Sequence, residues 1–247
     1  DDPGYVLTLE ITQQQENDLY SIPVPVQVQL QDAQQPANEL VKLSATSQQF
    51  TFAYKQRPLS VSIDPAYDIF RLLHTDERPA SLGRLFGNKK QLLVYPADAT
   101  SDQVRAWEQL AASWEKLYRN VNLVKDSELK KIHEDTAVWL LGWKNRLLEK
   151  QRKNLSTASR LLLTDKVYID GQQFNADKYA VILLAADNSA TGFIGAENTE
   201  TIQKLARKLP HYNSYGVLVF SSPAAKNILK QHLPVSSSLM TKKPHLE

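Results

Sequence analysis

The 247-residue chain contains no cysteine, which excludes disulfide bonds, thiol nucleophiles and cysteine-based metal sites. It also lacks an excess of charge of one sign. The formal net charge is +2 at pH 7, so we expect neither nucleic acid nor an anionic membrane as a partner. No apolar run approaches the ~20 residues that a membrane-spanning helix needs. The longest runs, such as residues 180–186, suit buried strands, and we predict no transmembrane segment.

A helical zinc motif is incomplete in this sequence. His133 and Glu134 begin the pattern H-E-x-x-H, but Ala137 stands where the second histidine is needed. Two histidines four residues apart share one helix face and can hold one ion, whereas a single histidine cannot. We therefore interpret the pair as a polar turn before the apolar run 137–142. We predict no metal and no cofactor.

Residues 1–64 carry the pattern of β-strands. Val24, Val26, Val28 and Leu30 alternate with polar residues, as a half-buried strand requires. Further short strands follow at intervals of about ten residues, which is typical of an antiparallel β-sandwich. The prolines within residues 19–30 remove ladder donors, so we expect this strand to begin at a sheet edge.

The pattern changes after residue 64. We predict a helical connector over residues 65–87, because its apolar residues recur at helical spacing. Residues 88–240 alternate strands and helices, with continuous apolar runs that favour parallel strands buried on both faces. We predict a three-layer α/β domain with a mostly parallel sheet, in which ligands bind beyond the carboxyl ends of the strands. The expected strands are 91–96, 121–125, 137–142, 179–186 and 215–221, the helices 101–118, 198–209 and 222–231, and the hairpin 166–174.

The two ends of the chain suggest a segment of a longer protein. It begins without methionine, and its last two residues, Leu246 and Glu247, resemble residues left by an expression vector. We expect residues 241–247 to form a tail, and we expect any signal peptide to lie outside this segment.

No catalytic motif is complete. The sequence lacks the G-x-S-x-G elbow of α/β hydrolases. Ser222 follows a strand, and we interpret it as the N-cap of a helix with Pro223 at the first helical position, just as Ser101 caps the helix 101–118. The alternative is that Ser222 is a nucleophile served by a histidine that is near only in space.

Three stretches are candidates for ligand binding. Residues 191–198 contain G-x-x-G, but neither G-x-G-x-x-G nor G-K-[ST]. Beyond the strand ends, Gly142, Asn145, Ser222 and Asn227, with Ser221, could present backbone and amide groups to a nucleotide or metabolite. His211 and Tyr212 belong to a basic and aromatic stretch, 205–220, that suits a sugar, peptide or phosphate, or else a helix C-terminus ended by Pro210.

Parts of the chain resemble a known family. A V/L-x-x-x-Q strand, a V-P-V strand and a terminal V-D-P occur in order at Leu9 to Gln13, Pro23 to Val26, and Ile63-Asp64-Pro65. This order resembles the β-sandwich that follows the catalytic domain in zinc aminopeptidases of the gluzincin class. Residues 64–87 and 205–220 look like the C-terminal region of large exported bacterial proteins with such a peptidase domain.

The resemblance covers most of the chain but brings no catalytic residue. The family's H-E-x-x-H and its downstream glutamate have no matching positions, and an α/β domain is expected in place of the family's helical superhelix. The resemblance implies a non-catalytic accessory segment of a larger periplasmic or extracellular protein, which packs on the upstream catalytic domain or recognises a protein or peptide. A flavodoxin-like module for a small ligand or nucleotide is the alternative.

Overall fold

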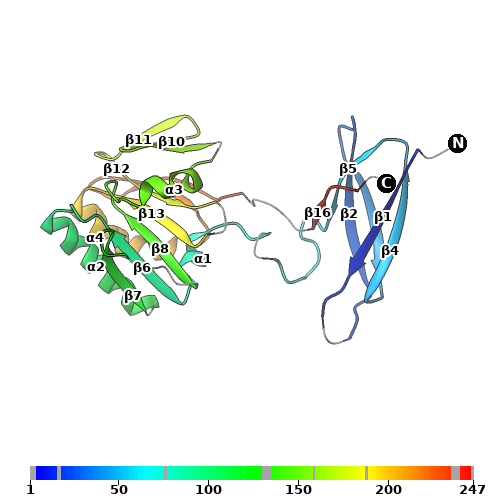
Figure 1. The fold of residues 1–247 in the computed structure, drawn as a ribbon, viewed down its shortest axis with the longest axis horizontal. Coiled ribbons are helices and arrows are strands. Elements are labelled where there is room, and N and C mark those ends of the chain that lie inside the picture. Colours follow the sequence, from blue (N-terminus) through cyan, green and yellow to red (C-terminus); the bar gives the residue numbers. More distant parts are fainter. Residues whose placement is uncertain are drawn as a thin grey trace. The chain divides into compact units, whose positions relative to one another are not determined.

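The computed structural model of the protein describes residues 4–15, 18–74, 77–118, 120–129, 135–157, 159–186, 189–234 and 240–245. The chain divides into two compact units. The first comprises residues 1–77 and 237–247, and the second residues 78–236. Figure 1 labels the helices and strands of both. His133 and Glu134 lie outside the described residues.

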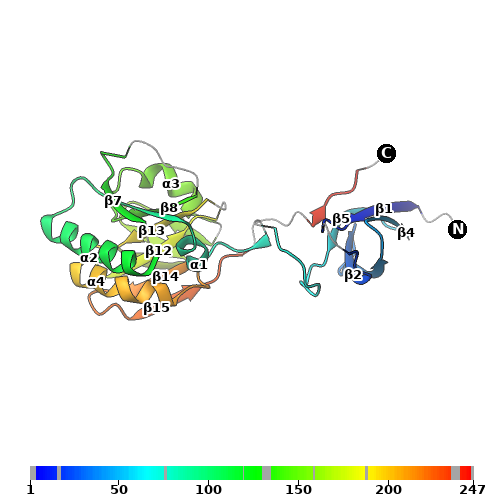
Figure 2. The same cartoon turned by 90° about the horizontal axis from the view of Figure 1, so that it is seen from below.

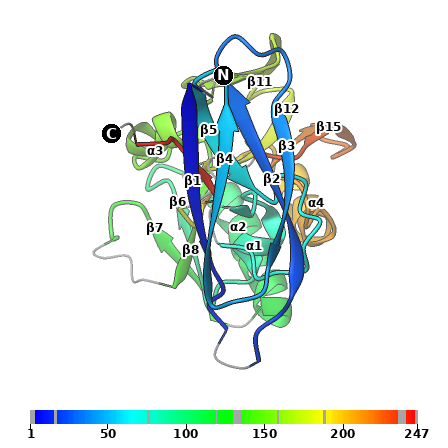
Figure 3. The same ribbon diagram turned by 90° about the vertical axis from the view of Figure 1, so that its right-hand side faces the viewer.

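The first unit is a small antiparallel β-sandwich, as the alternation predicts (Figure 3). One sheet has the order β1-β4 and the other the order β16-β5-β2-β3. The side chains of Val24, Val26 and Val28 are buried between the two sheets. The strands are β1 Tyr5–Thr12, β2 Ile22–Leu30, β3 Ala37–Leu43, β4 Ser47–Tyr54, β5 Pro58–Ile63 and β16 Thr241–Lys242.

Two details of this unit bear on the predictions. Strand β5 pairs with β2 only from Val26 onward, so Pro23 and Pro25 lie where β2 has a strand on one side alone. The expected edge position is therefore confirmed. Part of the predicted tail, 241–247, belongs to the sandwich, because Thr241 and Lys242 pair with Ser62 and Val61 of β5.

The connector differs from the predicted helix over residues 65–87. Its only described α-helix is α1, Leu82–Phe86. The carboxylate of Asp64 accepts hydrogen bonds from the backbone N–H groups of Asp68 and Ile69, at 2.7 and 3.2 Å. Since a side chain uses these N–H groups, they cannot be shared with carbonyls of a preceding helical turn. Helical spacing of apolar residues thus failed to predict the local structure here.

The second unit is a mixed α/β fold around a seven-stranded sheet of order β15-β14-β12-β13-β8-β6-β7. Three neighbouring pairs are parallel and three are antiparallel, so the prediction of a mostly parallel sheet was wrong. Strands β12 and β13 follow each other directly, and so short a connection permits only antiparallel pairing. The strands are β6 Lys90–Tyr95, β7 Val121–Lys125, β8 Thr136–Leu141, β12 Tyr179–Leu184, β13 Thr191–Gly195, β14 Val217–Ser221 and β15 Asn227–Gln231.

The predicted helix over residues 222–231 is wrong as well. The Ser222–Pro223 peptide is cis, and Ala225 has a φ of +51°. The N–H of Ser221 donates to the carbonyl of Lys226 at 2.9 Å, which closes a turn between β14 and the edge strand β15. Ser222 therefore caps no helix.

The helices cover the two faces of the sheet unequally. Figures 1 and 2 show α2 (Ser101–Tyr118) and α4 (Thr199–Lys208) side by side on one face, with α3 (Leu148–Leu155) on the other. A three-stranded sheet lies next to α3, and its strands are β9 Arg160–Leu162, β10 Lys166–Ile169 and β11 Gln172–Asn175. The predicted hairpin 166–174 corresponds to β10 and β11.

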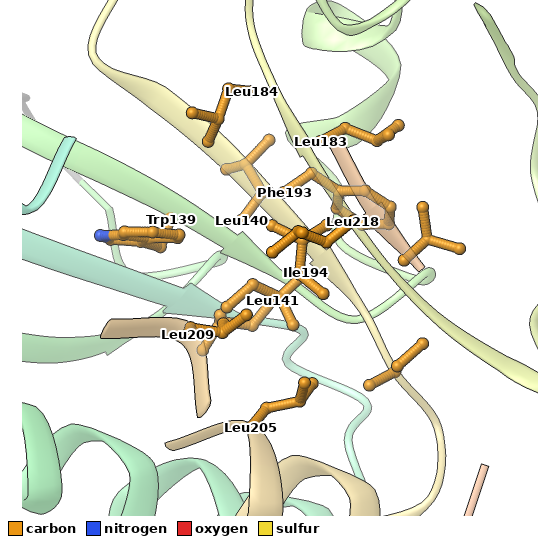
Figure 4. Packing of buried hydrophobic residues seen from close by; sticks show 14 of the residues in the cluster. Trp139, Leu140, Leu141, Leu183, Leu184, Phe193, Ile194, Leu205, Leu209 and Leu218 are labelled. Carbon is orange, nitrogen blue, oxygen red and sulfur yellow. The ribbon is translucent and has the colours of Figure 1, made fainter. Parts of the chain in front are cut away.

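The core beneath α2 and α4 is rich in aromatic rings. The ring of Trp114 from α2 lies 4.8 Å, centroid to centroid, from Trp139 of β8 and from Phe86 of α1. Figure 4 shows Leu205 from α4 packed toward Leu141 at the end of β8. Burial of such large side chains provides most of the free energy of folding of a unit of this size.

Close packing also explains the G-x-x-G of residues 192–195. A Cβ on Gly192 would come within 2.7 Å of Leu85, and a Cβ on Gly195 within 2.6 Å of Trp143 and Phe193. These glycines lie in β13, where neighbouring side chains leave no room for a larger residue. They serve packing, not a phosphate.

A capping box fixes the start of α2. The side chain of Gln103 accepts from the N–H of Thr100 at 3.1 Å, and the hydroxyl of Thr100 accepts from the N–H of Gln103 at 3.3 Å. Thr100, not Ser101, is therefore the capping residue. The cap sets the N-terminus of α2 just beyond the end of β6.

Candidate functional site

A small crevice lies where parallel strands end in the second unit. Strand β6 continues into α2 on one face of the sheet, whereas its neighbour β8 continues toward α3 on the other face. The chain thus leaves these two strands in opposite directions, which is where α/β sheets usually bind ligands. The lining residues are Pro96, Asp98, Ala99, Gln103, Trp107, Gly142, Trp143, Lys144, Ala196 and Glu197.

The crevice is small. Its enclosed space is about 10 Å³, which is roughly the room that one water molecule needs. A ligand of a few atoms would therefore lie mostly in the open mouth of the crevice, and a nucleotide would not fit.

Buried polar side chains hold the loops of this crevice in place. Asn145 is 4% exposed. Its Nδ2 donates to the carbonyls of Val94 at 2.7 Å and Leu141 at 3.2 Å, which joins the ends of β6 and β8. Its Oδ1 accepts from the N–H of Leu147 at 3.1 Å. Asn145 thus fixes the loops that form the crevice without lining it.

Asp126 also holds two loops of the crevice in place by hydrogen bonds. It directly follows β7, and its carboxylate accepts from the N–H groups of Ala97 at 3.0 Å and Arg146 at 2.9 Å. These two N–H groups belong to the loops after β6 and β8. Because buried partners fix both loops, the crevice has its shape before any ligand binds.

Gly142 makes the turn at the end of β8. Its φ is +74°, a conformation that side chains other than glycine rarely adopt, and a Cβ here would lie 3.1 Å from Cγ of Pro96. The positive φ predicted for this residue is confirmed. The turn directs the next residue, Trp143, to the crevice.

Trp143 carries a hydrogen-bond donor without an acceptor. Its side chain is buried, and its ring packs edge-on against Phe193 at 5.2 Å. Among the described residues the buried indole Nε1 has no partner, whereas Nε1 of Trp114 donates to the carbonyl of Ala206 and Nε1 of Trp139 donates to Gln91. Buried donors are nearly always satisfied, so this N–H is an exception in the core beside the crevice.

The crevice presents charge of both signs. Glu197 accepts from Nε2 of Gln103 at 3.0 Å, and Asp98 is exposed at the rim. Lys144 is exposed at the same rim, close to the N-terminus of α2. A cation and two carboxylates therefore line one small space, and the buried indole of Trp143 lies beside it.

The structure separates the residues proposed from the sequence. Gly142 lines the crevice and Asn145 supports it. Oγ of Ser222 lies 2.9 Å from Oγ1 of Thr201, a contact between two hydroxyls and not with a histidine. Asn227 donates to the carbonyls of Val219 and Leu229, so it fixes the start of β15.

His211 and Tyr212 lie at the other end of the strands from the crevice. They follow the C-terminus of α4 and precede the start of β14. The ring of Tyr212 packs edge-on against Phe220 at 5.5 Å, while His211 is exposed. The two residues do not join the other candidates in one site.

Two functional residues were not predicted. Trp143 and Asp126 each directly follow a strand of the parallel part of the sheet. A tryptophan in that position, next to the turn glycine, is the signal that the sequence did contain.

The described part of the chain shows neither a metal-binding cluster nor a membrane-spanning helix. No group of three or more His, Cys, Asp or Glu residues that could hold a metal ion occurs there. None of its helices combines the length and the apolar composition that crossing a membrane demands. Comparison of the chain with family models, with curated proteins and with solved structures gives no match.

Proposed function

We propose that this chain is a non-catalytic recognition segment of a larger protein, and that its second unit binds a small zwitterion of the amino-acid type in the crevice beyond β6, β8 and β13. The unpartnered indole N–H of Trp143 carries this proposal. A buried donor without an acceptor is costly in the free protein, and a ligand oxygen would remove that cost.

The charges of the crevice support the class of ligand. A carboxylate would accept from Nε1 of Trp143 and pair with Lys144, near the positive end of the α2 dipole. An ammonium group would pair with Asp98 and Glu197. A free amino acid, or the end of a short peptide, carries both groups within the few atoms that the space permits.

The wider setting rests on the resemblance of the sequence. We propose that the parent is an exported aminopeptidase-like protein, that its catalytic domain lies upstream, and that this segment supplies recognition while the chemistry takes place elsewhere. The second unit, with helices on both faces of its sheet, would act as the three-layer α/β module of that protein.

Calorimetric titration of the intact chain tests the ligand class. We expect glycine to bind, and glycinamide and acetate to bind at least about tenfold more weakly, because each lacks one of the two charges. Lys144→Met should weaken glycine binding by about tenfold, whereas Lys150→Met, which removes an exposed lysine from α3, should leave it unchanged. Equal binding of all three compounds, or none, would contradict the proposal.

Packing on another domain is the second candidate function, and the connector favours it. Leu72 is 95% exposed and Phe70 is fully exposed, although both are large apolar side chains. Arg71 between them is held by Asp64 and Glu77, so the two apolar side chains are presented on a fixed backbone. Such exposure is typical of a docking segment, and we propose the upstream domain as its partner.

A further inference from the structure

In a different part of the second unit, the buried Arg160 has no counter-ion among the residues that the structure describes. Arg160 begins strand β9, and only 3% of the residue is exposed. Its Nη2 donates to the carbonyl of Leu184 at 3.0 Å. Leu184 is the last residue of β12, which runs antiparallel to β13. This position therefore lies at the end of the sheet where β13 begins, whereas the crevice lies at the end where β13 finishes.

Two further nitrogens of this guanidinium lack an acceptor. Nε and Nη1 of Arg160 are buried and have no hydrogen-bond partner within the described part of the chain. Burial lowers the pKa of Arg160 to about 10, so the group is still charged at pH 7. A water molecule would satisfy the N–H groups but would leave the charge uncompensated, and an uncompensated buried charge is strongly destabilising. An anion satisfies both needs.

We propose that Arg160 is the receptor for the carboxylate of a small molecule. A guanidinium presents paired N–H donors in one plane, which match the two oxygens of a carboxylate. The site has one positive charge to compensate, and a carboxylate carries one negative charge, whereas phosphate at pH 7 carries more than one. This site does not depend on the crevice, because different residues at opposite ends of the strands form the two sites.

Thermal unfolding of the intact chain tests this site. Formate is the probe, and sodium chloride replaces it at constant ionic strength in the reference samples. We expect the Tm of the second unit to rise with the logarithm of the formate concentration above the Kd, by about 3 °C at a tenfold excess of formate over its Kd. Arg160→Met should abolish the rise. Arg207→Met, which removes an exposed arginine of α4, should keep it.

Two further comparisons make the test decisive. In chloride alone, Arg160→Met should melt at a higher temperature than the natural chain, since it removes a buried charge without a partner. Arg160→Lys keeps the charge but loses the planar pair of donors, so it should need about tenfold more formate for the same rise. An unchanged Tm in formate, an equal rise in Arg160→Met or Arg160→Lys, or a larger rise in phosphate than in formate would overturn the proposal.

Discussion

Two arginines, the partly buried Arg71 and the buried Arg160, show how differently the two units use charge. Arg71 in the first unit donates to Asp64 at 2.9 Å and to both oxygens of Glu77 at 2.8 and 2.9 Å. The hydrogen bonds with Glu77 raise the pKa of Arg71 above its ordinary value. Arg160 in the second unit has no carboxylate partner in the described ranges, and burial lowers its pKa. The first arginine has its counter-ions within the fold, whereas we propose that the second takes its counter-ion from a ligand.

The two units also differ in whether their other buried polar side chains have hydrogen-bond partners. Gln13 of the first unit donates to the carbonyls of Tyr20 and Ala45 and accepts from the N–H of Tyr20. Within the described ranges, every buried side-chain nitrogen or oxygen that lacks a partner belongs to the second unit: Thr136 Oγ1, Trp143 Nε1, Arg152 Nε, and Arg160 Nε and Nη1. These atoms lie in the unit for which we propose a role in recognition.

The largest effect should come from breaking the paired arginine. Arg71→Met leaves the carboxylates of Asp64 and Glu77 buried without their cation, and removal of one partner of a buried pair costs about 3–5 kcal/mol. Urea unfolding of the first unit measures this loss. Arg57→Met removes an exposed arginine and should change the free energy of unfolding by less than about 0.5 kcal/mol. Similar losses in both variants would show that the buried cluster is not structural.

A smaller loss is expected at the support of the crevice. Asn145→Ala leaves the carbonyls of Val94 and Leu141 without their donor, which should destabilise the second unit by about 1–3 kcal/mol. Asn122→Ala, at an exposed position of β7, is the matched control. If Asn145→Ala unfolds at the same urea concentration as the control, the ends of β6 and β8 are held by other contacts.

The exposed connector should tolerate substitution. Phe70→Ser with Leu72→Ser removes no buried contact, so the free energy of unfolding of this chain should change by less than about 0.5 kcal/mol. Ile69→Ser in the same segment removes a side chain that packs against the sandwich core, and it should be clearly destabilising. Equal destabilisation by both changes would mean that Phe70 and Leu72 support the fold and are not free to dock.

The smallest effect concerns alkaline pH. Burial and the nearby Glu39 raise the pKa of Tyr54 from 10.0 to about 12. The folded state therefore holds this proton more tightly than the unfolded state, and the contribution to stability is complete below pH 10 and is lost as the pH rises toward 12. Burial also raises the pKa of Tyr118, so phenolate absorbance should show late ionisations, of which Tyr54→Phe removes one. This late ionisation should vanish in urea, and its persistence there would refute the assignment to the fold.

Local signals in the sequence predicted the elements that local chemistry determines. The alternation of Val24, Val26 and Val28 predicts a sheet with one buried face, and the limits of α2 agree with the predicted 101–118. The N-cap of α4 is Asn198, whose side chain accepts from the N–H of Thr201 at 2.9 Å. In each case the residues that decide the structure are close in sequence.

Contacts between distant residues decided the rest. Apolar runs such as Tyr179–Leu184 show that a strand is buried but not the direction of its neighbours, so antiparallel pairing was missed. In the irregular connector, Asp64 and Glu77 hold Arg71, and helical spacing does not reveal these contacts. At the crevice, the turn at Gly142 was predictable, whereas the open N–H of Trp143 depends on every atom packed around it.

The most direct test of the account is the ¹⁵N–¹H spectrum of the four tryptophan indole groups, recorded on the intact chain during a titration with glycine. Trp143→Phe assigns the Trp143 signal. The account predicts that this signal shifts downfield and saturates, while the signals of Trp114 and Trp139, which already have acceptors, stay in place. A Trp143 signal that does not move, or equal movement of all four signals, would contradict the claim that the second unit keeps a buried donor open for a ligand.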